Sequence, residues 1–198
     1  MILFTQRLDQ EIEYTGKELR PHYILEKTRQ YGSGIIAFEG PCFVKTEALV
    51  DWEDRLSHDH IKAKKMIHFI GEFFQADLID IVLVQRLMVS IAADALRARV
   101  GHRFTIARDG DDIFVSAAAG EPKKKLSVSI VTSSAVSQVL HLGINIDAEG
   151  APVAAIGLND LGVNSKEFSK EFTDQVLKTT HAELQSVSLA CTKVRAVV

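Results

Sequence analysis

The sequence predicts an α+β domain in which one mixed or antiparallel sheet packs against helices. Three observations predict this class. The long apolar segment Asp77–Val100 has the length and composition of a buried helix. Several short runs typical of strands follow between residues 103 and 146, close enough together to be joined as hairpins. A second long helix is expected from Asn164 to about Leu189, and strands grouped apart from helices are typical of an α+β domain.

The N-terminal part predicts short strands and one short helix. Met1–Tyr14 contains strand-like runs and leads into a turn at residues 14–17. A helix is expected over Arg20–Gln30, with Pro21 at its first position, where the missing N–H is not needed. Two strands are expected next, at Ile35–Phe38 and Cys42–Val44, and the pair Gly40-Pro41 between them is expected to form a turn.

The middle of the chain predicts two helices. Residues 48–60 are acidic and irregular, and Ala63–Phe74 is expected to be helical. Asp77–Val100 carries apolar residues on almost every face, and Gly101 follows at the position of a C-cap. A helix that is apolar all round is buried on all sides, so we expect this one to lie between layers.

The second half predicts four strands and the last helix. The strands are expected at Arg103–Arg108, Asp112–Ser116, Lys125–Thr132 and Val136–Ile146. In the third strand polar and apolar residues alternate, so Leu126, Val128 and Ile130 should face the core. The other face would then carry Lys125, Ser127 and Ser129. Asn164 and Glu167 have the spacing of a capping box at the start of the last helix.

Composition limits the class of protein. The 198 residues are 46% hydrophobic and 25% charged, which predicts one globular domain over residues 1–198 that folds without disulfides or metals. A net charge of −3 gives no reason to expect a nucleic-acid or membrane partner. Two cysteines, no secretion signal and no membrane-spanning run predict a cytoplasmic protein. Whether it forms a homo-oligomer is left open.

Three blocks in the second half occur in a familiar order: Arg108–Val115 (RDGDDIFV), Lys125–Ser129 (KLSVS) and His141–Ile146 (HLGINI). Together with the preceding helix and the segment Gly157–Gly162, they resemble the catalytic domain of biotin- and lipoate-protein ligases, a class II synthetase-like fold. The likeness covers about residues 77–189. The whole chain is also similar to a mostly archaeal family, domain of unknown function 366, which has similar Gly-Asp-Asp-Ile and Lys-Leu-Ser-x-Ser blocks.

The ligase resemblance implies ATP-dependent activation and transfer of a small carboxylic acid, with ATP and Mg²⁺ as cofactors and an acceptor that the sequence does not identify. Lys125 would stabilise the phosphoryl transition state, Asp112 would orient this lysine or hold Mg²⁺, and His141 is the third catalytic candidate. The alternative for Lys125 is a solvated basic loop, Lys123–Lys125. The candidates for substrate or nucleotide binding are Arg20, His22, Glu39, Asp54, His68, Glu72, Ser127 and Asn145.

Two departures from the ligase pattern leave a second class of function open. The region expected to close over the ligand offers only Tyr31–Gly34 in place of a triple glycine, and Val128 replaces a strand glycine. The alternative is therefore a non-catalytic small-molecule or nucleotide-binding protein on the same scaffold.

A polar cluster between Asp51 and Glu72 suggests a third possibility, an enzyme of different chemistry. On a helix, His68 and Glu72 would share a face. The spacing matches no metal signature, so no residue is assigned as a metal ligand. We further expect five of the polar candidates to converge on one cleft, namely Arg20, Glu39, Asp54, His68 and Lys125.

Overall fold

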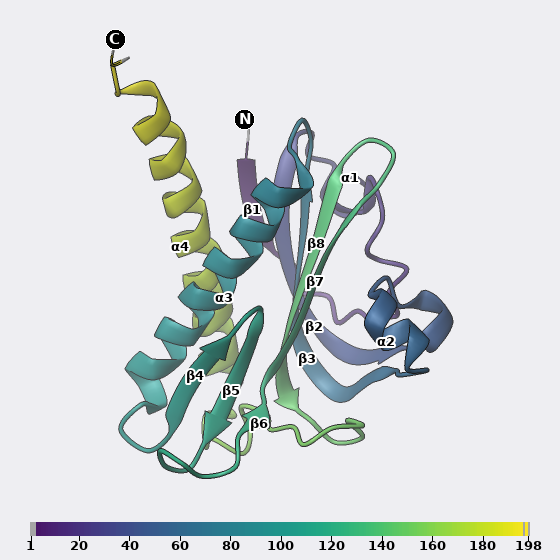
Figure 1. The fold of residues 1–198 in the computed structure, drawn as a ribbon, viewed down its shortest axis with the longest axis vertical. Coiled ribbons are helices and arrows are strands. Elements are labelled where there is room, and N and C mark those ends of the chain that lie inside the picture. Colours follow the sequence, from purple (N-terminus) through teal and green to yellow (C-terminus); the bar gives the residue numbers. More distant parts are fainter. Residues whose placement is uncertain (1–2, 196, 198) are drawn as a thin grey trace.

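A five-stranded sheet organises the molecule, and a three-stranded sheet lies beside it (Figure 1). The computed structural model describes residues 3–195 and 197. In chain order the elements are β1 (Leu3–Arg7), α1 (Tyr23–Thr28), β2 (Ser33–Val44), a 3₁₀ turn (Thr46–Ala48), α2 (Trp52–Leu56), β3 (Ile61–Phe73), α3 (Leu78–Val100), β4 (Thr105–Asp109), β5 (Asp112–Ser116), β6 (Lys124–Lys125), β7 (Ser127–Ser133), β8 (Gln138–Asp147) and α4 (Lys166–Thr192). The predicted α+β class is confirmed.

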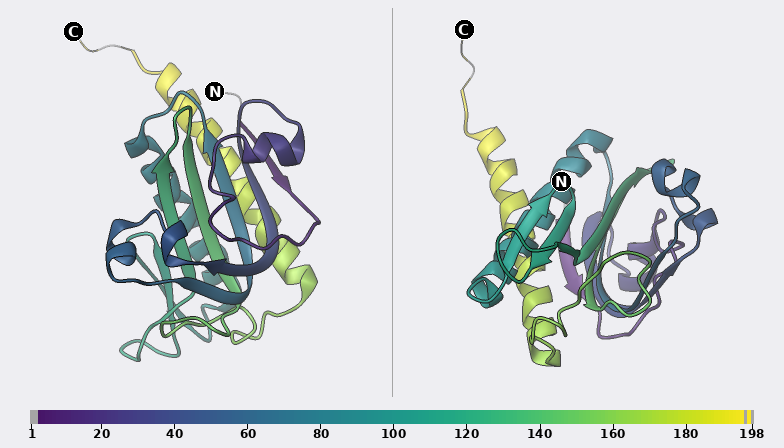
Figure 2. Two further views of the ribbon diagram at one scale, coloured as in Figure 1. Left: turned by 90° about the vertical axis from the view of Figure 1, so that its right-hand side faces the viewer. Right: turned by 60° about the horizontal axis from the view of Figure 1, so that its bottom comes forward.

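The large sheet has the order β1-β2-β3-β8-β7 and is mixed. Its edge strand β1 runs parallel to β2, and the other pairs are antiparallel. Helices α3 and α4 cover one face (Figure 2). The N-terminal segment, α1 and the loop that carries α2 lie over the other face, where a second apolar cluster forms. The molecule thus has two cores, one on each side of the sheet.

The segment expected to be a helix over Ala63–Phe74 is strand β3, so that prediction is wrong. β3 pairs with β2 on one side and with β8 on the other. Every residue from Met66 to Phe73 is buried. A strand buried on both faces has a nearly continuous apolar run without alternation, and such a run does not distinguish a strand from a helix.

Gly40 and Pro41 do not form a turn, contrary to the prediction. They lie inside the single strand β2, at a bulge where the pairing with β3 shifts register between Gly40 and Cys42. A Cβ atom at Gly40 would overlap the carbonyl oxygen of Ile12, so only glycine fits. This close approach brings the N-terminal segment onto the face of the sheet, where the Ile12 N–H donates to the Glu39 carbonyl.

Helix α3 is amphipathic rather than buried all round. One face, with Met88 and Leu96, packs in the core, while Leu78, Ile79 and Leu83 are exposed. As expected of a helix between layers, α3 contacts strands of both sheets, β7 and β8 of the large one and β4 of the small one, but the expectation that it is buried on all sides is wrong. The C-cap prediction is confirmed, since the helix ends at Val100 and the N–H of Gly101 donates to the carbonyl of Arg97 at 2.9 Å.

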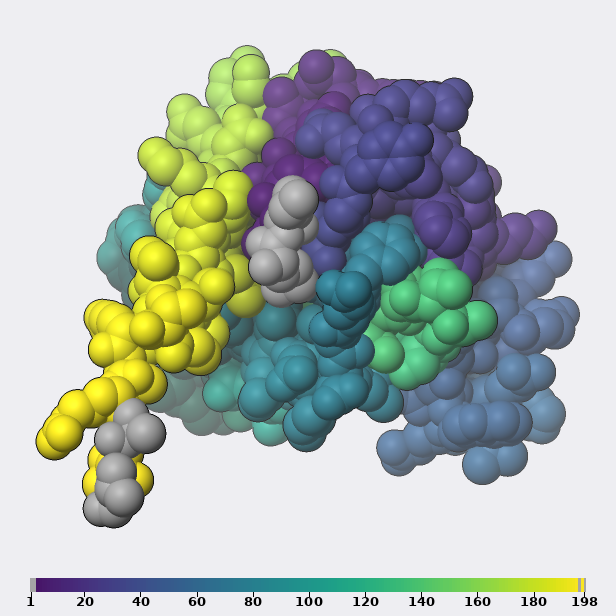
Figure 3. Space-filling view, turned by 90° about the horizontal axis from the view of Figure 1, so that it is seen from above, coloured from purple at the N-terminus to yellow at the C-terminus, as the bar shows by residue number. Residues whose placement is uncertain are grey.

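Helix α4 begins one residue later than the capping box predicts. Ser165 is the N-cap, and its hydroxyl accepts from the N–H of Phe168 at 3.0 Å. The buried residues of α4 end at Thr180, and the last turns project beyond the sheet (Figure 1). In the view from above, the yellow C-terminal end of the chain stands out from the rest of the surface (Figure 3). Among the described residues, no helix has the length and apolar character needed to cross a membrane.

The remaining predictions for local structure differ in detail. Helix α1 is shorter than Arg20–Gln30 and begins at Tyr23. The strand-like run expected from Met1 is described from Leu3, and residues 1, 2, 196 and 198 lie outside the described part. The single strand expected over Lys125–Thr132 is divided at Leu126, because β6 pairs with β5 in the small sheet whereas β7 pairs with β8 in the large one.

Candidate functional site

A cavity of about 330 Å³ lies between the large sheet and the segment that carries α2. The N-terminal segment and the segment that carries α2, both of which contribute to the lining of the cavity, lie on the face of the sheet opposite α3 and α4 (Figure 2). Pockets of this size bind small molecules, which favours this cavity as the candidate site. Six of the predicted site residues line it: Asp54, Asp112, Lys125, Ser127, His141 and Asn145.

The polar end of the cavity is built around Lys125. Its ammonium is 2.8 Å from the Asp112 carboxylate, and both side chains are mostly buried. Burial raises the pKa of Asp112, although the hydrogen bond from Lys125 opposes this. The side-chain amide of Asn145 donates to the carbonyl oxygen of Ile156 at 3.2 Å and to that of Lys125 at 3.4 Å, so it positions the backbone of the lysine.

Asp111, next to this pair, is bound by protein groups. Its carboxylate lies 2.7 Å from the Arg86 guanidinium and accepts from Gln85 and Ser129. Burial acts to raise the pKa of Asp111, but the ion pair with Arg86 outweighs it and the pKa is lowered. Asp112 therefore orients Lys125, while Asp111 holds α3 against the small sheet.

The cavity is acidic around its rim. The lining carboxylates are those of Asp51, Asp54, Asp59, Asp111 and Asp112, against two lysines, Lys62 and Lys125. Burial, and then the neighbouring Asp51, raise the pKa of Asp54. A bound anion would therefore depend on these two lysines or on a cation that it brings with it.

Two buried histidines lie at the cavity. His141 on β8 lines it, and His68 on β3 lies behind His141, with Nε2 of His141 3.0 Å from Nδ1 of His68. Tyr14 stacks on His141 with the ring centroids 3.8 Å apart. Burial lowers the pKa of His68 to about 4 and the pKa of His141 well below its usual value. Both imidazoles are therefore neutral at pH 7.

The other predicted candidates lie elsewhere, so the expected convergence on one cleft is wrong. Arg20 is paired with Glu26 at the surface. Glu39 is paired with Lys65 in a separate cavity near the start of α4. His68 lies under the cavity floor rather than on it. Asp54 and Lys125 alone of the five line the cavity.

His22 and Glu72 bind each other. The backbone N–H of His22, at the start of α1, donates to both carboxylate oxygens of Glu72 at 2.8 and 3.0 Å. Ser137 also donates to this carboxylate at 2.8 Å. Both residues were candidates for substrate or nucleotide binding, but the His22 N–H and the Glu72 carboxylate are engaged with groups of the protein itself. The polar cluster between Asp51 and Glu72 is not one site, because its members lie on different faces and loops.

The single strand face expected to carry Lys125, Ser127 and Ser129 is not formed, because Lys125 belongs to β6 and the two serines to β7. The Ser127 hydroxyl accepts from the N–H of Ile113 at 2.7 Å, and the Ser129 hydroxyl bonds to Asp111. The strand break at Leu126 shifts the alternation, which places Val128 against the cluster on the cavity side. Lys125 is therefore the cation at this end of the site without the two serines beside it.

No pattern in the sequence predicts Tyr14 as a site residue, yet it forms part of the cavity lining. It lies at an expected turn, and its backbone is held against β2, where its N–H donates to the Pro41 carbonyl and its carbonyl accepts from the Phe43 N–H, both at 2.9 Å. Asp59 was an ordinary loop residue in the sequence and lies on the rim. Both come into the site through tertiary contacts rather than a local motif.

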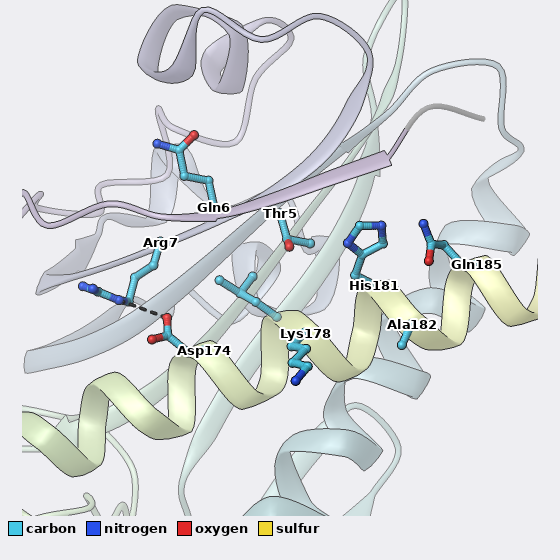
Figure 4. A pocket seen from close by; sticks show the side chains of 9 residues that line it. Thr5, Gln6, Arg7, Asp174, Lys178, His181, Ala182 and Gln185 are labelled. Atoms are coloured by element: carbon cyan, nitrogen blue, oxygen red, sulfur yellow. Dashed lines mark hydrogen bonds and ion pairs between the residues drawn. The ribbon is translucent and has the colours of Figure 1, made fainter.

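A second cavity, of about 370 Å³, lies between β1 and α4 (Figure 4). Arg7 and Asp174 form an ion pair across it, with Nε and Oδ1 3.1 Å apart. No residue predicted for the site lines it. The cavity beside Lys125 is therefore the stronger candidate.

The comparisons with known proteins identify the family. Residues 3–195 match the family described as Domain of unknown function (DUF366). The chain belongs to this family. The DUF366 chain is 36% identical over 158 residues to the uncharacterized protein MJ0805 of Methanocaldococcus jannaschii, covering 77% of this chain and 67% of that protein. A protein of unknown function from Pyrococcus horikoshi superposes with a TM-score of 0.86 and 31% identity over all of both chains.

The fold of this DUF366 protein is that of the biotin and lipoate protein ligases. A biotin protein ligase from Aquifex aeolicus, solved with biotin and ATP, superposes with a TM-score of 0.56 and 13% identity, over 91% of this chain and 70% of that one. Lipoate protein ligases share the fold as well. The fold implied by the resemblance noted in the sequence is confirmed. At 13% identity, the likeness shows a shared fold and not a shared activity.

Proposed function

We propose that this protein binds a small carboxylic acid in the cavity beside Lys125 and activates it with ATP for transfer to an acceptor. One observation carries the proposal: the partly buried side chain of Lys125, paired with Asp112, stands in a cavity that also has an apolar part, lined by residues such as Leu49, Val128 and Ile130. An apolar body would fill the cavity, and the carboxylate would contact Lys125. Related folds solved with biotin and ATP support this assignment.

The acidic rim supports ATP entering with Mg²⁺ rather than alone. Among residues 3–195 and 197, no group of three His, Cys, Asp or Glu side chains is arranged to hold a metal. Mg²⁺ commonly needs only one or two carboxylates in addition to substrate phosphates, and Asp54 and Asp112 near Lys125 fit that mode. Bound there, Mg²⁺ would neutralise phosphate charge. Lys125 would stabilise the charge that develops when the carboxylate displaces pyrophosphate.

Pyrophosphate release tests this function. The purified protein is incubated with ATP, Mg²⁺ and single carboxylic acids from a panel that includes biotin, lipoic acid and octanoic acid. We expect release that depends on one class of acid and falls at least tenfold in Lys125→Met. Release in no mixture would rule out adenylation of these acids.

A non-catalytic binding protein is the second candidate, and the acidic rim and the ion pair already formed by Lys125 favour it. Such a protein would show a ligand-dependent rise in melting temperature without ATP consumption. Thermal shift with the same panel, with and without ATP, separates the two functions. Binding with no pyrophosphate release would support the second.

A further inference from the structure

The two buried histidines form a hydrogen-bonded chain that the activation of a carboxylate does not use. It starts at the bulge of β2, where the carbonyl oxygen of Gly40 is 3.2 Å from Nε2 of His68. It continues through Nδ1 of His68 to Nε2 of His141 at 3.0 Å. His141 then lines the cavity, covered by the ring of Tyr14.

The direction of this chain follows from chemistry. A carbonyl oxygen only accepts, so Nε2 of His68 carries the hydrogen. His68 is neutral at pH 7, because burial lowers its pKa to about 4, and its Nδ1 must therefore accept. Nε2 of His141 is then the donor. Since burial also keeps His141 neutral, its Nδ1 carries no hydrogen.

This bare nitrogen is set in an apolar wall. The strand register places Ile130 beside His141 on β7, and the neighbouring pair is Val128 and Gly143. Met66 fills the space over Gly143. Of the described residues, His68 alone hydrogen-bonds the imidazole of His141. An acceptor in such a wall is matched by a donor from whatever occupies the cavity.

We propose that His141 is a specificity-determining residue that accepts a hydrogen bond from an N–H or O–H on the body of the ligand. This inference rests on the proposed function, because it assigns the carboxylate end to Lys125. Asn145, which binds the backbone of Lys125, lies four residues from His141 on β8, or about 13 Å along the strand. The substrate class is therefore an elongated carboxylic acid with a hydroxyl, amide or urea donor towards its far end.

Pairs of acids that differ in one donor test the specificity. Isothermal titration compares octanoic with ω-hydroxyoctanoic acid, and decanoic with ω-hydroxydecanoic acid. In at least one of the two pairs, the wild type is expected to bind the hydroxy acid roughly threefold to tenfold more tightly than the acid without the hydroxyl. His141→Gln keeps a donor towards His68 but loses Nδ1, and should abolish the preference. His141→Asn, the matched control, places an oxygen near the Nδ1 position and should retain part of it. Equal affinity of the wild type for both members of each pair overturns the proposal.

The tautomer is tested without a ligand by long-range ¹H–¹⁵N NMR of the imidazoles. We expect Nε2 of His141 to be protonated and Nδ1 to be bare; a proton on Nδ1 overturns the proposal. His68 acts as a positioning residue, so in His68→Gln the Nδ1–H tautomer of His141 should become populated.

A further titration separates failure of the proposed function from failure of the role of His141. If none of these acids binds, the proposed carboxylate binding fails, and NMR titration with ethylene urea then tests His141 alone. This probe has two N–H donors and no carboxylate. A change in the His141 Nδ1 shift supports the proposal, and no change overturns it.

Discussion

Lys125 is held by one carboxylate, and its neighbour Lys124 in the same short strand is exposed. Lys125→Met keeps most of the side-chain stem and removes the charge. We expect ligand affinity to fall by about tenfold to a hundredfold, which corresponds to losing a charged hydrogen bond worth about 1.5–3 kcal/mol. Lys124→Met is the matched control and should leave affinity unchanged. Equal losses in the two variants would mean that the lysines act only as surface charges.

Gly40 carries both the bulge of β2 and the contact with Ile12. In Gly40→Ala the added Cβ would overlap a backbone oxygen, and neither strand can yield without disturbing the sheet. We expect a loss of about 1–3 kcal/mol in the free energy of unfolding, measured by urea denaturation. Gly120→Ala, in open space, should cost about 1 kcal/mol or less, from its positive φ alone. A cost at Gly40 no larger than at Gly120 would show that the segment around Ile12 moves away freely.

Among the elements, α3 offers a direct comparison of its two faces. Met88 is 0% exposed and Leu83 is 62% exposed. We expect Met88→Ala to reduce the free energy of unfolding by about 2–5 kcal/mol because it leaves a cavity in the core. Leu83→Ala should change it by less than about 0.5 kcal/mol. Similar effects at the two positions would contradict the assignment of the buried face.

The elements also show which features could be predicted from sequence. Helix α3, strand β5 and the C-cap at Gly101 were predictable because length, caps and turns are local signals. Strand β3 was not, since burial on both faces removes the alternation that marks a strand. The division at Leu126 was not predictable either, because it depends on which sheet each half of the segment joins.

The site was predictable only in part for the same reason. Lys125, Asp112 and His141 belong to blocks with a recognisable order, and all three line the cavity. Glu72 and His22 were chosen for their chemistry alone. Their partners are each other, across 50 positions of the chain, and no local pattern contains that contact.

At the scale of the whole molecule, stability should depend on pH through the buried histidines. The pKa of His68 is about 4 in the folded state against an ordinary value of 6.5, so between these values the unfolded chain binds the extra proton. The free energy of unfolding therefore has its full value above pH 6.5. It decreases as the pH falls towards 4, by on the order of 3 kcal/mol for His68 alone. Urea denaturation at pH 7, 6 and 5 measures this fall. In His68→Gln the fall should be smaller, and a flat profile in the wild type would contradict neutral burial.

Helix α4 has a consequence for how the molecule opens. Its 27 residues extend about 40 Å, but its buried residues all lie between Ser169 and Thr180. Beyond Thr180 the contacts with the rest of the molecule come from partly buried side chains such as Leu184, so these turns fray at lower cost than the turns before them. Amide hydrogen exchange in α4 should therefore be slow between Ser169 and Thr180, where it requires global unfolding. Beyond Thr180 it should be fast, because local opening of the helix is enough.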